Sequence, residues 1–189
     1  MTKHVLFIQG AGEGAYEEDK ALAASLRQSL GPAYEVHYPA MPDEDNAPYD
    51  QWTRVIEQEL ASLPSPVILV GHSVGASVIA KWLSELKAED PIANAIRGVF
   101  LMSNPFWGGD GWRYDGYEEL ELPDRFAASL PKHIAIALYH ARDDETVPFG
   151  HLALYTRILP QASVHEIDEG GHQLNNDLSA VAHDIKTLQ

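Results

Sequence analysis

The segment from Val67 to Leu83 constrains the fold of this chain more than any other part of its sequence. An apolar, β-branched run, Val67–Val70, ends in GHSVG (residues 71–75), and apolar residues at helical spacing follow at once. This pattern predicts a strand, a sharp turn with a serine at its apex, and a helix. The two glycines suit such a turn because a side chain would clash where strand and helix pass closely. The alternative, an ordinary turn with a buried serine, is the weaker interpretation because the apolar frame extends on both sides.

Short apolar runs alternate with helical patterns along the rest of the chain. We expect strands at residues 4–9, 34–38, 67–70, 98–103, 133–139 and 163–167, and helices at residues 17–30, 50–63, 73–86, 149–159 and 177–188. Short apolar strands separated by helices imply a parallel sheet that is covered on both faces. We therefore predict an α/β fold, a three-layer sandwich with about six mostly parallel strands, in one domain that spans residues 1–189.

The composition excludes several classes of partner and chemistry. The formal net charge of −15 opposes binding to nucleic acids and to anionic membranes, since the field of the protein repels both. The absence of cysteine excludes disulfides, thiolate catalysis and cysteine metal sites. The first apolar run, Val5–Ile8, is too short for the core of a signal peptide, and no stretch approaches the roughly 20 apolar residues of a membrane span. We therefore expect a cytoplasmic protein whose partner is a small molecule, not a nucleic acid or a membrane.

A serine at such a turn is a weak nucleophile unless a base takes its proton, and the base needs an acid to orient it. Two later segments supply both groups. HARDDETVP (residues 140–148) follows the fifth expected strand and contains the adjacent carboxylates Asp143 and Asp144, and Gly170-Gly171-His172 follows the sixth. Because carboxyl ends of parallel strands meet at one edge of a sheet, we expect the serine, an acid and His172 to converge. An imidazole suits the role of base, since its ordinary pKa of about 6.5 lets it accept and return a proton near neutrality.

The other eight histidines have simpler interpretations. Six fall at or in expected strands and helices, where a histidine is usually a surface group or a satisfied interior one: His4, His37, His133, His151, His165 and His183. His140 starts the acid loop and is a candidate to line the site, whereas His72 is expected to point away from the serine hydroxyl and to shape the turn. No pair has the spacing of a zinc motif such as H-E-x-x-H, so we expect neither a metal ion nor an organic cofactor.

The first expected strand ends in a glycine-rich loop, QGAGEG (residues 9–14). Such a loop can cradle a phosphate, but neither the G-x-x-x-x-G-K-[ST] pattern nor the G-x-G-x-x-G pattern is met. The other use of the loop is to present a backbone N–H to the serine. The amides of Ala11 and of Val74, the residue after the serine, would then form an oxyanion hole, with Gly10 and Gly12 beside the substrate.

Together these motifs resemble the α/β-hydrolase superfamily, and within it the small, lidless serine hydrolases of the retinoblastoma-binding-protein type. The resemblance extends from the QGAG loop through GHSVG to the D-x-x-V-P segment that starts at Asp144, and to Gly171-His172. It implies a minimal α/β-hydrolase fold without a lid domain. It also favours Asp144, three residues before the Val-Pro, as the acid. Asp143 would then face solvent or pair with Arg142.

The resemblance implies a hydrolase of esters, thioesters or amides that forms an acyl-enzyme on Ser73, with His172 as the base and Asp144 as the orienting acid. An open, lidless site would admit small or medium substrates. One alternative is a non-hydrolytic enzyme on the same site, such as a lyase or an acyltransferase, because one fold hosts many chemistries. Another is a binding protein with a vestigial site, against which the intact serine, acid and histidine argue.

The one long irregular stretch, residues 104–123, follows the fourth expected strand, at the sheet edge where open α/β folds place their sites. Its Phe106 and Trp107 either form an aromatic wall for the substrate or pack on the edge of the sheet. Two acids, Glu13 and Asp110, would disfavour anionic substrates if they face the site. The sequence specifies neither the natural substrate nor the oligomeric state.

Overall fold

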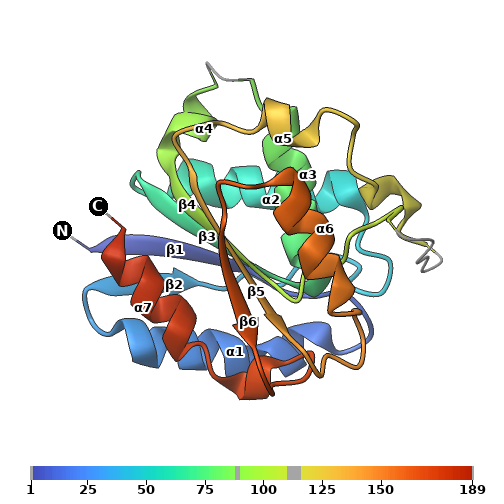
Figure 1. The fold of residues 1–189 in the computed structure, drawn as a ribbon. Coiled ribbons are helices and arrows are strands. Elements are labelled where there is room, and N and C mark those ends of the chain that lie inside the picture. The colour runs from blue at the N-terminus through green and yellow to red at the C-terminus, as the bar shows by residue number, and fades with distance from the viewer. Residues whose placement is uncertain (1, 88–89, 110–115, 189) are drawn as a thin grey trace.

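The computed structural model describes residues 2–87, 90–109 and 116–188 and contains one sheet of six strands (Figure 1). The strands lie in the order β2-β1-β3-β4-β5-β6, and every neighbouring pair is parallel. Their bounds are β1 (Lys3–Ile8), β2 (Tyr34–His37), β3 (Val67–His72), β4 (Ile96–Met102), β5 (Ala135–Ala141) and β6 (Ser163–Ile167). The predicted sheet is confirmed, and within the described residues all of its strands are parallel.

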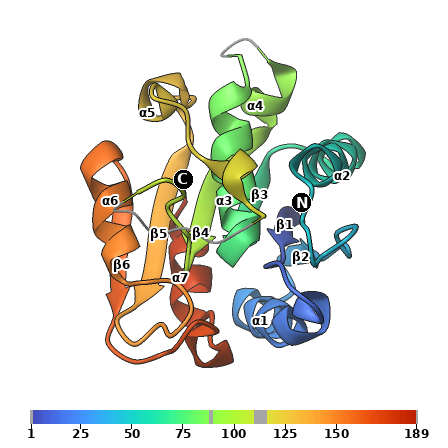
Figure 2. The same cartoon turned by 90° about the vertical axis from the view of Figure 1, so that its right-hand side faces the viewer.

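Helices cover both faces of this sheet (Figure 2). One face carries α1 (Ala15–Leu30) and α7 (Ser179–Thr187), and the other carries α2 (Tyr49–Ser62), α3 (Ser73–Glu85) and α6 (Gly150–Ile158). Shorter helical segments lie in the connections: α4 (Pro91–Ala95), α5 (Phe126–Ser129), and the 3₁₀ turns η1 (Glu118–Leu120) and η2 (Leu174–Asn176). The predicted three-layer α/β sandwich is therefore confirmed.

The long helices form where apolar residues recur at helical spacing. Leu22, Leu26 and Leu30 of α1 are buried, and so are Trp52 and Ile56 of α2. A spacing of four residues returns to the same side of a helix, so each set forms a stripe that packs on the sheet. Among the described residues, no helix has both the length and the apolar character needed to cross a membrane.

Several element boundaries differ from the prediction. β3 continues to His72 and β5 to Ala141, so Ser73 and Asp144 follow their strands more closely than expected. α7 begins at Ser179, two residues later than predicted, because Asp177 has an extended backbone (φ −120°, ψ 107°) and Leu178, with φ −105° and ψ 24°, is not helical either. α4 was not predicted. Asp90 caps its first turn by accepting a hydrogen bond from the Ile92 amide at 2.9 Å.

Parallel pairing brings all the carboxyl ends of the strands to one edge of the sheet. β1 and β3 are neighbours, although β2 lies between them in the sequence, so the strand order reverses at this point. Loops that leave two such strands diverge to opposite faces and open a crevice, which is where α/β sheets bind ligands. The loops after β1 and β3 border this crevice, and the loops after β5 and β6 approach it from the same edge.

Candidate active site

Ser73 occupies the turn between β3 and α3 in a strained backbone conformation. Its φ angle is 50°, a left-handed value that a residue with a side chain rarely adopts. The flanking glycines are required by close contacts. A Cβ at Gly71 would lie 2.7 Å from the Cα of Ala76, and one at Gly75 would lie 2.1 Å from the carbonyl oxygen of Gln9. The turn therefore follows from its sequence, and it brings Ser73 to the edge of a pocket.

The side chains of His172 and Asp144 form a close pair. Nδ1 of His172 lies 3.1 Å from Oδ1 and 3.0 Å from Oδ2 of Asp144. Asp144 follows β5 and His172 follows β6, and the two strands are parallel neighbours. Because Nδ1 carries the proton in this bond, Nε2 of the neutral ring presents a lone pair. His172 and Ser73 line the same pocket.

Asp144 is held as a buried carboxylate by four partners. Its side chain is fully buried, and its Oδ1 accepts hydrogen bonds from the amides of Thr146 (2.9 Å) and Val147 (2.8 Å). His140 Nε2 lies 3.2 Å from Oδ2. Burial alone would raise the pKa of Asp144, but hydrogen bonds from His140, His172 and Val147 hold that pKa far below its ordinary value. The group therefore stays ionised throughout the neutral range.

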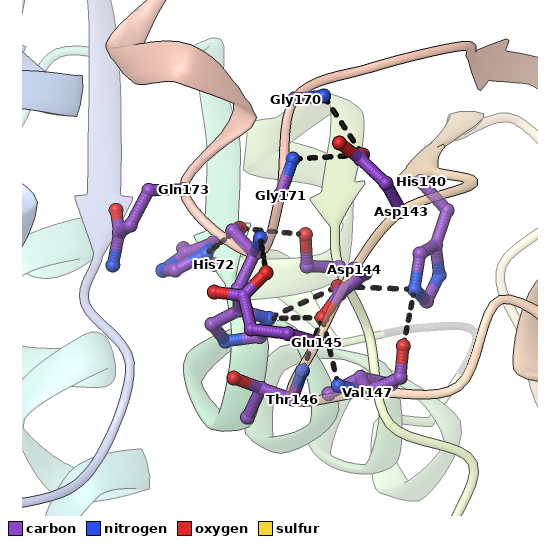
Figure 3. A network of polar contacts seen from close by, with 12 residues as sticks. His72, His140, Asp143, Asp144, Glu145, Thr146, Val147, Gly170, Gly171 and Gln173 are labelled. Atoms are coloured by element: carbon purple, nitrogen blue, oxygen red, sulfur yellow. Dashed lines mark hydrogen bonds and ion pairs between the residues drawn. The ribbon is translucent and has the colours of Figure 1, made fainter.

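Asp143 anchors the loop that carries His172 (Figure 3). Its Oδ1 accepts hydrogen bonds from the amides of Gly170 (2.8 Å) and Gly171 (2.9 Å). These bonds lower the pKa of Asp143. The carboxylate is exposed, as expected, but the expected alternative of a pair with Arg142 is wrong. Arg142 reaches across to β6 and the loop after it, and pairs there with Glu166 and Asp168.

Three further contacts fix the backbone of His172. Glu145 Oε2 accepts a hydrogen bond from its amide at 3.1 Å. The carbonyl oxygen of His172 accepts hydrogen bonds from Ser103 Oγ and from Nε2 of His72, both at 3.0 Å. Ser103 follows β4, is fully buried, and has a left-handed φ of 47°. Sequence reasoning missed Ser103, because no local pattern distinguishes a serine that reaches a carbonyl 69 residues away.

A second histidine–aspartate pair lies directly behind Ser73. Nδ1 of His72 is 2.9 Å from Oδ2 of Asp19, and both side chains are 1% exposed. The same carboxylate accepts hydrogen bonds from the Gly10 amide at 2.8 Å and from Nε2 of Gln173 at 3.1 Å. The pair thus links the loop after β1, the turn after β3 and the loop after β6.

Both ring nitrogens of His72 face acceptors. A carbonyl oxygen cannot donate, so Nε2–H must donate to His172, and Nδ1–H donates to the Asp19 carboxylate. The ring is therefore an imidazolium. Burial would lower the pKa of His72, but the charge and hydrogen bond of Asp19 and the His172 carbonyl raise it above 6.5. Burial would raise the pKa of Asp19, but His72, Gly10 and Gln173 lower it below 3.8.

The glycine-rich loop after β1 is shaped by two carboxylates. The Gly10 amide donates to Asp19, and the Gly12 amide donates to the carbonyl oxygen of Glu44 at 2.8 Å. The Glu44 side chain accepts from the amides of Gly14 and Tyr16, both at 2.9 Å, at the start of α1. These bonds use the amides on either side of Ala11. The Ala11 residue between them lines the pocket.

The pocket at this edge has a volume of about 250 Å³. Seven of the nine residues assigned to the site from the sequence line it: Gly10, Ala11, Gly12, Ser73, Val74, Trp107 and His172. The two that do not are Asp144 and Phe106. Asp144 lies behind His172. Of the two alternatives for Phe106, the structure favours packing, because this residue does not line the pocket and its ring packs edge-on against Tyr155.

The acids of the pocket also differ from the expectation. Glu18 and Glu145 line it, together with the paired Asp19, whereas Glu13 does not. Asp110, the other acid named from the sequence, lies outside the described residues. The expectation that His140 lines the site is wrong, because this buried ring contacts Asp144 and the Val147 carbonyl instead. The lining thus combines apolar side chains, such as Trp107, with acidic ones.

Comparison with known proteins places this geometry in context. Residues 23–180 match the family described as "Serine hydrolase". A search of the curated proteins found no match. Among solved structures, the chain is similar to the ydeN gene product of B. subtilis, with 20% identity, a TM-score of 0.73, and coverage of 99% of this chain and 98% of that one. It is also similar to SOBER1 of Arabidopsis thaliana, with 16% identity, a TM-score of 0.69 and 98% coverage of each chain. A third is the esterase domain of a Rhodothermus marinus protein, with 14% identity, a TM-score of 0.64, and coverage of 97% and 84%.

Proposed function

Because this chain belongs to the serine hydrolase family and has a compact α/β-hydrolase fold, we propose that it hydrolyses an ester, thioester or amide through an acyl-enzyme on Ser73. The strongest support for this proposal is the contact between His172 and Asp144. Nδ1 of His172 is held at 3.0 Å by the buried carboxylate of Asp144, in a pocket that His172 shares with Ser73. This is the arrangement that a histidine base needs, because the acid fixes the tautomer and stabilises the imidazolium.

The reaction begins when Ser73 Oγ attacks the substrate carbonyl carbon and His172 Nε2 takes the hydroxyl proton. The carbonyl oxygen becomes an oxyanion that the amides of Ala11 and Val74 stabilise. Val74 is in the first turn of α3, where a backbone N–H has no partner within the helix. The carbon–heteroatom bond then breaks, and the leaving group departs with the proton from His172.

Water completes the cycle. His172 Nε2 removes a proton from a water molecule as the water oxygen attacks the acyl carbon, and the same proton returns to Ser73 Oγ when the ester bond to Ser73 breaks. The products are a carboxylic acid and the free enzyme. No step uses a metal ion or an organic cofactor, so hydrolysis is expected to be unchanged by EDTA.

The size and charge of the pocket favour short acyl compounds that are uncharged or cationic as substrates. Its volume of about 250 Å³ is below the range of roughly 300–1,000 Å³ typical of drug-sized ligands. Glu18 and Glu145 stand in the lining, and the net charge of the chain is −15. Both features repel a carboxylate on the substrate.

A panel of p-nitrophenyl esters tests this function. We expect kcat/KM for the acetate and butyrate esters to exceed that for the decanoate ester by at least about tenfold, since one methylene changes transition-state binding by up to 1–3 kcal/mol. An anionic hemisuccinate ester should react more slowly than the butyrate ester, and Glu145→Gln should narrow that difference. Turnover that persists in Ser73→Ala would exclude the proposed mechanism. Transfer of the acyl group to an added alcohol without hydrolysis would favour an acyltransferase.

A further inference from the structure

The opposite end of the sheet carries a cluster of metal-ligating side chains that hydrolysis does not use. Within the part of the chain that the structure describes, one group of three such residues brings its donor atoms together: His4, Glu35 and His37. His4 lies near the start of β1, and the other two lie on β2. Four steps of about 3.3 Å separate His4 from the end of β1, before the loop that enters the active site. The cluster is therefore separate from that site.

The strand register explains why the three side chains meet. β1 and β2 are parallel, with His4 opposite Glu35 and Leu6 opposite His37. Alternate residues of a strand point to the same face, so Glu35 and His37 share a face, while Val36 between them is buried in the core on the α1 side. Leu6 belongs to the core on the other side, so His4, two residues before it, shares that face.

The donor atoms have the separations of a tetrahedral metal site. Nδ1 of His4 and Nε2 of His37 are 3.1 Å apart, and the carboxylate oxygens of Glu35 lie 3.7 Å and 3.9 Å from them. Bonds of about 2.1 Å to one ion at tetrahedral angles place donor atoms about 3.4 Å apart. A hydrogen bond between the two rings accounts for the first distance only. The carboxylate is too far from either nitrogen for a hydrogen bond, yet it faces both.

We propose that His4, Glu35 and His37 form a binding site for one Zn²⁺ ion. Two imidazoles and one carboxylate are a ligand set that zinc uses when a fourth position is left to water. Calcium and magnesium require oxygen ligands and are not expected to bind. Two features favour capture of a cation: the net charge of −15, and the position of His4 and Glu35 in the wall of a surface hollow, which gives the ion a path of entry.

Zinc binding requires a change of protonation. In the metal-free protein, one of the two facing nitrogens carries the proton of the His4–His37 hydrogen bond. Both nitrogens must offer lone pairs to the ion, so this proton moves to the far nitrogen of its own ring or leaves to solvent. The carboxylate of Glu35 provides one negative charge to the bound ion.

The test is isothermal titration calorimetry of the full chain with ZnCl₂, after circular dichroism has shown that each variant melts cooperatively. We expect saturable binding of one ion to the wild type, an affinity at least about 30-fold lower in His37→Gln, and one about tenfold lower in Glu35→Gln. His165→Gln, which changes a partly exposed strand histidine on the opposite edge of the sheet, is the matched control and should bind as the wild type does.

A second readout locates the ion even if a variant fails to fold. In wild-type protein, Zn²⁺ should shift the imidazole ¹⁵N resonances of Nδ1 of His4 and Nε2 of His37, and it should raise Tm by about 5–10 °C at 100 times Kd. The proposal is wrong if His37→Gln binds zinc as tightly as the wild type, or if the wild type shows no saturable binding. It is equally wrong if binding is lost in His172→Ala but not in His37→Gln, which would place the ion in the hydrolase site.

Discussion

Two histidine–aspartate pairs lie near Ser73, and they differ in whether the histidine has a ring nitrogen that is not already hydrogen-bonded. In the pair of His172 and Asp144, the carboxylate occupies Nδ1 and the other ring nitrogen belongs to a side chain that lines the pocket. In the pair of His72 and Asp19, the ring has both nitrogens on acceptors and is 1% exposed. We therefore expect the first pair, and not the second, to exchange a proton with a substrate.

If His172 is the base and His72 is not, then residue type and a hydrogen bond to a carboxylate are not sufficient to make a histidine a base. His72 is adjacent to Ser73 in sequence, and its ring centroid lies 4.8 Å from that of His172. Its second nitrogen is used by the carbonyl oxygen of His172 itself. The second pair ties the backbone of His172 to the loop of Gly10. We therefore predict that it positions the first pair.

The largest expected effect comes from removing the base. His172→Ala should lower kcat for an ester by a factor on the order of 10⁴ to 10⁶, since Ser73 then has no proton acceptor. His140→Ala, which removes a neighbouring histidine from the same carboxylate, should cost much less. Stopped-flow or steady-state ester assays on both variants make the comparison. A near-normal kcat in His172→Ala would mean that the base is elsewhere.

The next effect separates the two adjacent carboxylates. Asp144→Asn should lower kcat by a factor on the order of 10⁴, because an amide favours the wrong tautomer of His172. Asp143→Asn should change kcat little, since the remaining amide oxygen can still accept from Gly170 and Gly171. Kinetics of the two variants under the same conditions decide between them, and the reverse ranking would move the acid by one residue.

A moderate effect is expected from neutralising the second pair. The double variant Asp19→Asn/His72→Gln should lower kcat by about 10–100-fold with a smaller change in KM, because displaced loops misplace the reacting groups. His133→Gln, a control far from the pocket, should have no effect. If the double variant keeps full kcat and melts cooperatively, the positioning role is wrong. A loss confined to Tm would assign the pair to stability alone.

The smallest effect is on stability as a function of pH. The pKa of His72 is raised above 6.5 in the folded protein. Its contribution to the stability of the fold is therefore complete below pH 6.5 and is lost as the pH rises through the folded-state pKa. The pKa of Asp19 is lowered below 3.8, so its contribution is present above that pH and is lost as pH falls. Melting curves should therefore show the largest Tm advantage of wild type over the double variant between about pH 5 and 6.5, by a few degrees. An advantage that is independent of pH would contradict the charged pair.

The fold and the central part of the site were predictable because their signals are local. The GHSVG turn, the stripes of α1 and α2, and the order of Ser73, Asp144 and His172 along the chain require only spacing and strand order. The close pairing of His172 with Asp144 follows from them, since β5 and β6 are parallel neighbours. The roles assigned to these residues, and the narrower resemblance to hydrolases of the retinoblastoma-binding-protein type, stay predictions.

The supporting contacts were not predictable, because each joins residues far apart in the sequence. Asp19 is one of several acids in α1, and its sequence context suggests a solvent-facing group. In the structure it pairs with His72, 53 residues away. Asp143 looks redundant beside Asp144 until the loop after β6 is placed against it. His4 and His37 have no metal-motif spacing, and only the register of β1 with β2 brings them together.

Covalent labelling tests the central claim most directly. A fluorophosphonate probe should phosphonylate wild-type protein at Ser73, identified by peptide mass spectrometry, because this serine alone is proposed to be activated by His172. Ser73→Ala should remain unlabelled, while Ser77→Ala, which changes a buried serine of the same helix, should be labelled like the wild type. Labelling that persists in Ser73→Ala, or that maps to another serine in the wild type, would contradict the assignment of Ser73 as the nucleophile.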